Sequence, residues 1–112
     1  MSLYDLVSEQ FKEALKKIEY DESILTYLSE PKHEIITNFP VKLDNDKIKL
    51  FRGYRVQHNN ILGPYKGGLR YCPNISLDES TTLATWMTLK NSLVRLPLGG
   101  GKGGLSIDPT LY

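Results

Sequence analysis

The sequence predicts an α/β fold in which a mixed β-sheet is flanked by helices. Three observations indicate it: a helical period in the first 18 residues, a two-residue period on both sides of a polar turn at 44–46, and a capped helix at 77–96 between two shorter strand-like runs. The length of 112 residues suits one small domain. We expect a helical opening over residues 1–30 and a mixed sheet over residues 31–112.

The opening residues show the pattern of an amphipathic helix followed by a shorter one. Ser2 is a plausible N-cap for the first helix, and the segment from Asp21 to Leu28 predicts the second. The apolar positions that recur at helical spacing in the first helix are Leu3, Val7, Phe11, Ala14, Leu15 and Ile18.

From Ile35 onward the apolar period changes to two, which is typical of β-strands. The turn Asp44-Asn45-Asp46 separates two such runs and predicts a hairpin. The alternating residues are Ile35, Thr37, Phe39, Val41 and Leu43 before the turn, and Ile48, Leu50, Tyr54 and Val56 after it. Further strands near 67–71 and 105–107 flank the long helix and complete the sheet.

The long helix is bounded by clear signals. Ser76 and Glu79 form a capping-box pattern, and Pro97 stops the segment. On a helical wheel, large apolar residues fill one half, small and polar residues fill the other, and Lys90 lies in the middle of the apolar half. We therefore expect Lys90 to be buried, where an unpaired ammonium is costly. A snorkelling stem or a structural ion pair is the alternative interpretation.

Two more lysines lie among glycines. In GPYKGGLR, the glycines let the backbone come close to a ligand while Lys66 projects from a strand or its edge, although the segment alone also fits an ordinary turn. In PLGGGKGG, no neighbouring side chain shields the amine of Lys102, so we expect an accessible loop; a mobile connector is the alternative.

Neither of two familiar phosphate-binding motifs fits the second glycine run. Gly99, Gly101 and Gly104 match GxGxxG, but the run follows a predicted helix and precedes a predicted strand, which is the reverse of the dinucleotide fingerprint. The P-loop pattern fails at Leu96 and Gly103. We therefore expect no cofactor-binding residues in this chain.

These motifs resemble a known family. The run from Phe51 to Pro109 contains GPYKGGLRY and WMTLKNSLVRLPLGGGKGG, in which Lys66, Lys90 and Lys102 are spaced 24 and 12 positions apart. It is similar to the amino-terminal dimerisation domain of glutamate dehydrogenases, in the Glu/Leu/Phe/Val dehydrogenase family. The resemblance covers about half of the chain strongly. The first 50 residues fit the family's helical opening and first strands less specifically.

The resemblance implies a role for each lysine. Lys66 matches the lysine that receives the substrate's side-chain carboxylate, Lys90 the one that holds the α-carboxylate, and Lys102 the catalytic lysine. Met87 stands where some members carry a glutamine that helps to bind the α-carboxylate. Relatives acting on leucine, phenylalanine or valine have an apolar residue in place of Lys66, so this lysine favours glutamate.

The implied reaction is the reversible oxidative deamination of L-glutamate to 2-oxoglutarate and ammonia, with NAD or NADP as cofactor. Two fixed positive charges disfavour a third, so Lys102 could act in its neutral form as a base toward water. The family's catalytic aspartate and nucleotide-binding Rossmann domain are absent from these residues. The chain therefore resembles a truncated enzyme, which we expect to be inactive alone and to bind no cofactor. The resemblance also implies a homo-oligomer, a hexamer in the full-length enzyme.

Composition excludes several other classes of function. A net charge of +1 with no basic stripe argues against nucleic-acid binding, and no apolar run is long enough to span a membrane. The single cysteine, Cys72, excludes an internal disulfide and suits a reducing compartment such as the cytoplasm. His33 and His58 show no metal-ligand spacing to it, so we expect no metal site.

Two alternatives from other classes remain open. The chain could be a free-standing binding module for dicarboxylates or phosphorylated metabolites, or a purely structural oligomerisation domain. The dehydrogenase interpretation predicts activity only when a nucleotide-binding domain is supplied. If the chain is a binding module, it should bind the ligand alone. If it is a structural domain, it should self-associate to the same extent after substitution of all three lysines.

Overall fold

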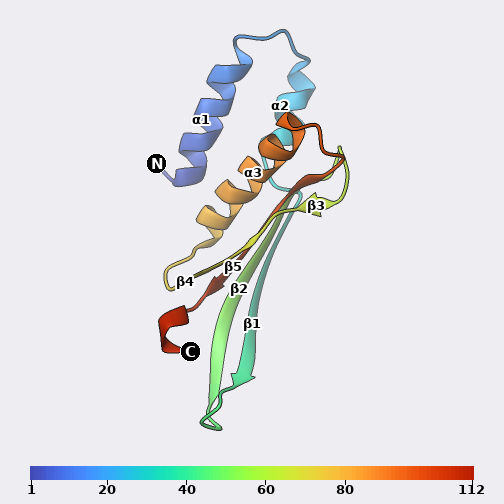
Figure 1. Cartoon of the computed structure of the whole chain (residues 1–112). Coiled ribbons are helices and arrows are strands. Elements are labelled where there is room, and N and C mark those ends of the chain that lie inside the picture. Colours follow the sequence, from blue (N-terminus) through green and yellow to red (C-terminus); the bar gives the residue numbers. More distant parts are fainter.

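The computed structural model describes all 112 residues and shows one mixed sheet with helices on one of its faces (Figure 1). The elements in chain order are α1 (Leu3–Leu15), α2 (Glu22–Leu28), β1 (His33–Lys42), β2 (Ile48–Asn59), β3 (Tyr65–Lys66), β4 (Leu69–Cys72), α3 (Leu77–Leu93), β5 (Gly99–Ser106) and the 3-10 turn η1 (Pro109–Leu111). The predicted fold class is confirmed. No helix has the length and apolar character needed to cross a membrane.

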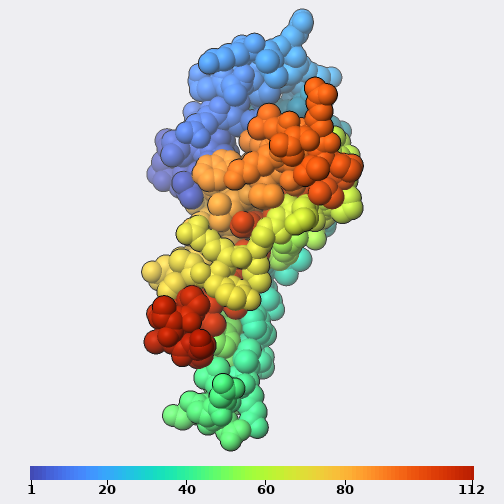
Figure 2. Space-filling model, in the orientation of Figure 1, coloured from blue at the N-terminus to red at the C-terminus, as the bar shows by residue number.

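The sheet is built around β5. The strand order is β1-β2-β5-β3, and β4 also pairs with β5. The long hairpin β1–β2 and the β2–β5 pair are antiparallel, whereas β3 and β4 run parallel to β5 along its other side. Helix α3 packs on this sheet and α1 packs on α3, while the far end of the hairpin extends beyond the helices as a narrow projection (Figures 1 and 2).

The predicted helix starts agree with the structure better than the predicted helix ends, whereas the last strand begins at Gly99 and not near 105. Ser2 caps α1 in a full capping box with Asp5, and Asp21 caps α2. The hairpin turns at 43–47, where Asp46 has φ 64°. Helix α1 ends at Leu15, so the predicted extension to Ile18 is wrong.

The prediction that the apolar half of α3 faces the core is wrong. Two large apolar side chains of that half point outward, since Leu93 is 80% exposed and Trp86 is also exposed, and none of the others is fully buried. Lys90 is exposed as well, and so is not the buried ammonium expected from the wheel. The side chains that α3 buries are small or polar, namely Ser80, Thr81, Thr82, Ala84, Thr85, Thr88 and Asn91.

Hydrogen bonds satisfy most of this polar interface, as they must because a buried polar group without a partner is destabilising; the hydroxyl of Ser80 is the exception on α3 and has no partner. Some hydroxyls donate to the helix itself: Thr82 to the Asp78 carbonyl and Thr85 to the Thr81 carbonyl, both at 2.9 Å. Thr81 also donates to a carboxylate oxygen of Glu34 on β1 at 3.0 Å. The helix can therefore bury its polar half without large aliphatic side chains.

Glycines in β5 allow α3 to approach closely. A Cβ on Gly100 would lie 2.1 Å from Thr88 Oγ1 and 2.7 Å from the carbonyl oxygen of Ala84, distances that real Cβ atoms do not reach. The glycine run is therefore the central strand of the sheet and not the accessible loop that the sequence suggested. Position 100 must be glycine because α3 occupies the space that a side chain on β5 would need.

His58 joins three elements inside the fold. It is 2% exposed; its Nδ1 lies 2.7 Å from Thr88 Oγ1 on α3, and its Nε2 lies 3.3 Å from the Leu28 carbonyl at the end of α2. Because a carbonyl can only accept, the neutral ring carries its proton on Nε2, and Nδ1 accepts from the hydroxyl. Burial lowers the pKa of His58, partly opposed by the Leu28 carbonyl.

Replacing Gly100 with alanine should destabilise the fold, because overpacking against a helix backbone costs about 1–3 kcal/mol or more. Gly53→Ala is the matched control on the neighbouring strand, where an added Cβ would meet only ordinary contacts at 3.4 Å or beyond. Urea unfolding should show a large loss for the first variant and little change for the second. Equal effects would contradict the proposed role of Gly100.

The free energy of unfolding should fall as pH drops below about 6.5, the ordinary pKa of histidine. The unfolded chain binds a proton at His58 before the folded chain does, so the stability is present above that pH and is lost as pH falls toward the lowered folded pKa. Urea melts between pH 8 and pH 5, compared with the variant His58→Gln, measure the effect. An identical pH dependence in the variant would exclude His58 as its cause.

Candidate functional site

Lys66 and Lys102 lie on adjacent parallel strands. Lys66 in β3 pairs with Gly100, and Leu69 in β4 pairs with Gly103, so the step Gly67–Gly68 between the two strands runs beside Gly101 and Lys102. Residues in register share a face of the sheet, and alternate residues of one strand share it too. Lys66 and Lys102 therefore lie on the face that carries α3, at the edge where β3 and β4 end the sheet.

The amine of Lys102 lies over the glycine step. A Cβ on Gly68 would be 3.2 Å from its Nζ. The backbone is tightly placed at this point, because a Cβ on Gly67 would lie 1.5 Å from the carbonyl oxygen of Gly101. Glycine is thus required at 67 by the close approach of β5, while at 68 it leaves room for the lysine head.

Helix α3 contributes the other two candidate residues. Met87 lies against the glycine step, since a Cβ on Gly67 would be 3.2 Å from its Cγ. Lys90 is three residues further along the helix, and positions three apart are neighbours on a helix surface. The structure thus brings the elements that carry Lys66, Lys90, Lys102 and Met87 together around the step 67–68.

These lysines are free of carboxylate partners. The ion pairs of the chain involve Lys12, Lys16 and Lys42, and Arg70 of β4 with Glu79 of α3 at 3.0 Å. No carboxylate lies within ion-pair distance of Lys66, Lys90 or Lys102. Three lysines without carboxylate partners, on elements that meet at one edge of the sheet, favour a positive potential that attracts an anion.

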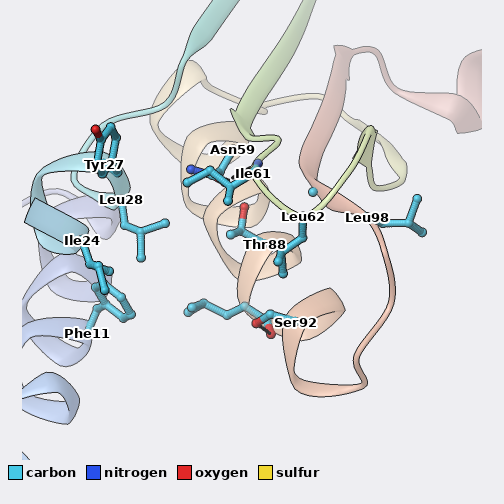
Figure 3. A pocket seen from close by; sticks show the side chains of 12 residues that line it. Phe11, Ile24, Tyr27, Leu28, Asn59, Ile61, Leu62, Thr88, Ser92 and Leu98 are labelled. Atoms are coloured by element: carbon cyan, nitrogen blue, oxygen red, sulfur yellow. Dashed lines mark hydrogen bonds between the residues drawn. The ribbon is translucent and has the colours of Figure 1, made fainter. Parts of the chain in front are cut away.

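The best-defined cavity lies elsewhere. It has a volume of about 310 Å³ and separates the side chains of α1 and α2, among them Phe11 and Ile24, from Leu62, Ser92 and Leu98 on the other side (Figure 3). None of the three lysines lines it. Its walls are almost wholly apolar, so it lacks the charge needed to bind a dicarboxylate.

Sequence reasoning missed Asn91. This side chain is 5% exposed, and its Nδ2 donates to the carbonyls of Gly99 at 2.7 Å and Lys66 at 3.4 Å. The available signal was an asparagine inside a helix, where its propensity is poor, directly after a candidate lysine. Asn91 thus connects α3 with both strands of the site.

The residues present do not fit a nicotinamide dinucleotide. The glycines of β5 form backbone pairs with β2 on one side and with β3 and β4 on the other, so they cannot form the open turn before a helix that binds a pyrophosphate. The chain also contains no cluster of three or more His, Cys, Asp or Glu side chains able to hold a metal ion.

Comparison with known proteins identifies the family. A profile described as "Glu/Leu/Phe/Val dehydrogenase, dimerisation domain" matches residues 31–112. The chain belongs to the Glu/Leu/Phe/Val dehydrogenase family. The match covers the whole sheet and α3, so it includes every candidate site residue.

Individual members of the family extend the similarity into the first helices. The chain is 46% identical over 108 residues to the glutamate dehydrogenase of Thermotoga maritima, covering 96% of the chain and 26% of that protein. It is 41% identical over 110 residues to the NAD-specific glutamate dehydrogenase of Clostridioides difficile, covering 98% and 26%. The hetero-hexameric, leucine-bound glutamate dehydrogenase of Thermus thermophilus superposes with a TM-score of 0.92 at 41% identity, covering 96% and 26%.

The chain therefore spans about a quarter of the length of these relatives. Over this shared quarter, the chain has the same fold as the solved Thermus thermophilus enzyme, with the mixed sheet and flanking helices predicted from the sequence.

The two glycines of the step should respond differently to alanine. Gly67→Ala should destabilise the fold, because its Cβ would collide with the backbone of β5, whereas Gly68→Ala would meet only the flexible end of Lys102. Urea unfolding should place Gly67→Ala at least about 1 kcal/mol below Gly68→Ala. A Gly68→Ala variant as unstable as Gly67→Ala would contradict this geometry.

Proposed function

We propose that this chain is the substrate-binding and subunit-assembly part of a glutamate dehydrogenase, which converts L-glutamate reversibly to 2-oxoglutarate and ammonia with NAD or NADP. The observation that carries the proposal is the gathering of elements with three unpaired lysines around the step 67–68. The names of the relatives support glutamate as substrate, and the NAD-specific relative favours NAD.

Each candidate residue has a distinct task in this proposal. Lys66 binds the side-chain carboxylate of glutamate, and Lys90 binds its α-carboxylate with Met87 beside it. A bound dianion satisfies two ammonium groups that have no carboxylate partner in the chain. The electrostatic match favours a substrate with two carboxylates over one with an apolar side chain.

Lys102 is the proposed proton-transfer residue. It comes from the central strand, so its backbone is held on both sides, and its long side chain carries the amine to Gly68 at the sheet edge. In its neutral form the amine can accept a proton from the water that attacks the imino acid, and return it in the reverse direction. A base on a rigid strand keeps this geometry from one turnover to the next.

Assembly is the second part of the proposal. The matched profile is described as a dimerisation domain, and the solved relative is a hexamer. We propose self-association of this chain into a homo-oligomer, with a hexamer as the state of the full-length enzyme, located in the cytoplasm. The two alternatives, a free-standing dicarboxylate-binding module and a structural oligomerisation domain, are outcomes of the following experiment.

The experiment compares this chain alone with a fused enzyme, in which the chain replaces the matching amino-terminal quarter of the Thermotoga maritima relative. Glutamate-dependent NAD(P) reduction by the fused enzyme, and none by the chain alone, is the expected result. Glutarate binding by the chain that Lys66→Ala weakens, without activity in the fused enzyme, would favour the binding module. Self-association without either property would favour the structural domain.

Lys66→Leu in the fused enzyme should lower kcat/KM for glutamate by about ten- to a hundredfold, since a charge-assisted hydrogen bond contributes about 1.5–3 kcal/mol. It should also raise activity toward leucine relative to glutamate. Lys47→Leu, in the exposed hairpin turn, is the matched control and should change neither value. Unchanged selectivity in Lys66→Leu would remove the role proposed for Lys66.

A further inference from the structure

Asn91 is a buried amide that contacts the backbone of two strands at once. Its Nδ2 donates to the Gly99 carbonyl at 2.7 Å and to the Lys66 carbonyl at 3.4 Å. Both partners can only accept, so the amide must present its two N–H groups to them and cannot be turned over. The side chain is 5% exposed, so it is largely shielded from water.

The position of Asn91 links the three elements that carry the lysines. It follows Lys90 directly in α3, it holds the carbonyl of Lys66 in β3, and it holds Gly99 at the start of β5, three residues before Lys102. No other side chain of the chain donates to the backbone of both β3 and β5.

The backbone of Asn91 is also held in place. Its carbonyl accepts from the Leu96 N–H at 2.9 Å, while the Arg95 N–H donates to Ser92 at 3.0 Å, and Arg95 has φ 58°. This is the Schellman pattern that closes a helix with one left-handed residue. The chain therefore turns out of α3 at Arg95, and this turn is anchored on the backbone carbonyl of Asn91.

We propose that Asn91 is a positioning residue, which fixes the strands of Lys66 and Lys102 relative to Lys90. The inference rests on the proposed function for the identity of the substrate, but not for the geometry. Without the amide, the carbonyls of Lys66 and Gly99 lose their hydrogen bonds to α3, so the side-chain tie between the helix and the ends of β3 and β5 is gone. A displacement of about 1 Å is enough to misplace the charges that orient a substrate and can cost about a hundredfold in rate.

The first measurement uses the 112-residue chain and needs no activity. A short amine-reactive diester should link Lys66 with Lys90 and with Lys102, as read by mass spectrometry. Asn91→Ala should lower the yield of these links severalfold and leave links between Lys12 and Lys16 on α1 unchanged. Thr82→Val is the matched control, because it also removes a buried hydrogen bond of α3, but one made within the helix.

The second measurement uses the fused enzyme. Asn91→Ala should raise KM for glutamate and lower kcat, each by about tenfold, so that kcat/KM falls about a hundredfold, the effect of two lost hydrogen bonds, while KM for NAD stays unchanged. Asn91→Gln, which keeps both donors on a longer side chain, should recover part of the loss. Thr82→Val should lower stability without moving either glutamate parameter.

A purely structural role gives a different result. If Asn91→Ala lowers the melting temperature as Thr82→Val does, but keeps the wild-type links and the wild-type KM for glutamate, the proposal is overturned. If Asn91→Ala does not fold, Asn91→Leu, which keeps the volume and removes the donors, is judged by the same criteria. An inactive wild-type fused enzyme would count against the proposed function alone, since the cross-link pattern still decides the role of Asn91.

Discussion

The close contact between α3 and β5 determines where the other elements can lie. The strand offers glycine at 100, and the helix meets it with small side chains, Ala84 and Thr88. Because the two backbones approach so closely, the edge of α3 that carries Met87 also reaches the strands beside β5. A larger residue on either side would move the helix outward and separate it from the step 67–68.

Local sequence signals predicted most elements, because those signals act over a few residues. The caps at Ser2, Asp21 and Ser76 mark helix starts through their own hydrogen bonds, and the turn at 43–47 is set by polar residues within it. The type and order of the elements followed from these signals except in the glycine run of β5, which was expected as a loop and is a strand. The predicted helix ends were less accurate. The residue in the left-handed conformation after α3 is Arg95, whereas the usual sequence signal for a helix end is a glycine at that position.

The buried face of α3 could not be predicted from hydrophobic period alone. Its core-facing side chains are polar, and their burial depends on partners far away in sequence, such as Glu34 for Thr81 and His58 for Thr88. The same reason explains why Lys90 was placed in the core and Asn91 was overlooked. For the site, residue types and spacing identified the lysines, whereas the strand pairing that brings Lys66 beside Lys102 became visible only in the fold.

The composition of the interior has a thermodynamic consequence. Only six hydrophobic residues are buried: Val7, Leu15, Phe51, Val56, Ile75 and Ala84. Between α3 and the sheet, the fold instead removes hydroxyls, an amide, an imidazole and glycine backbone from water. Exposure of apolar surface raises the heat capacity on unfolding, and exposure of polar surface lowers it. This chain should therefore unfold with a heat-capacity change below the usual value of about 12–15 cal/mol/K per residue, so that its free energy of unfolding follows a less strongly curved dependence on temperature.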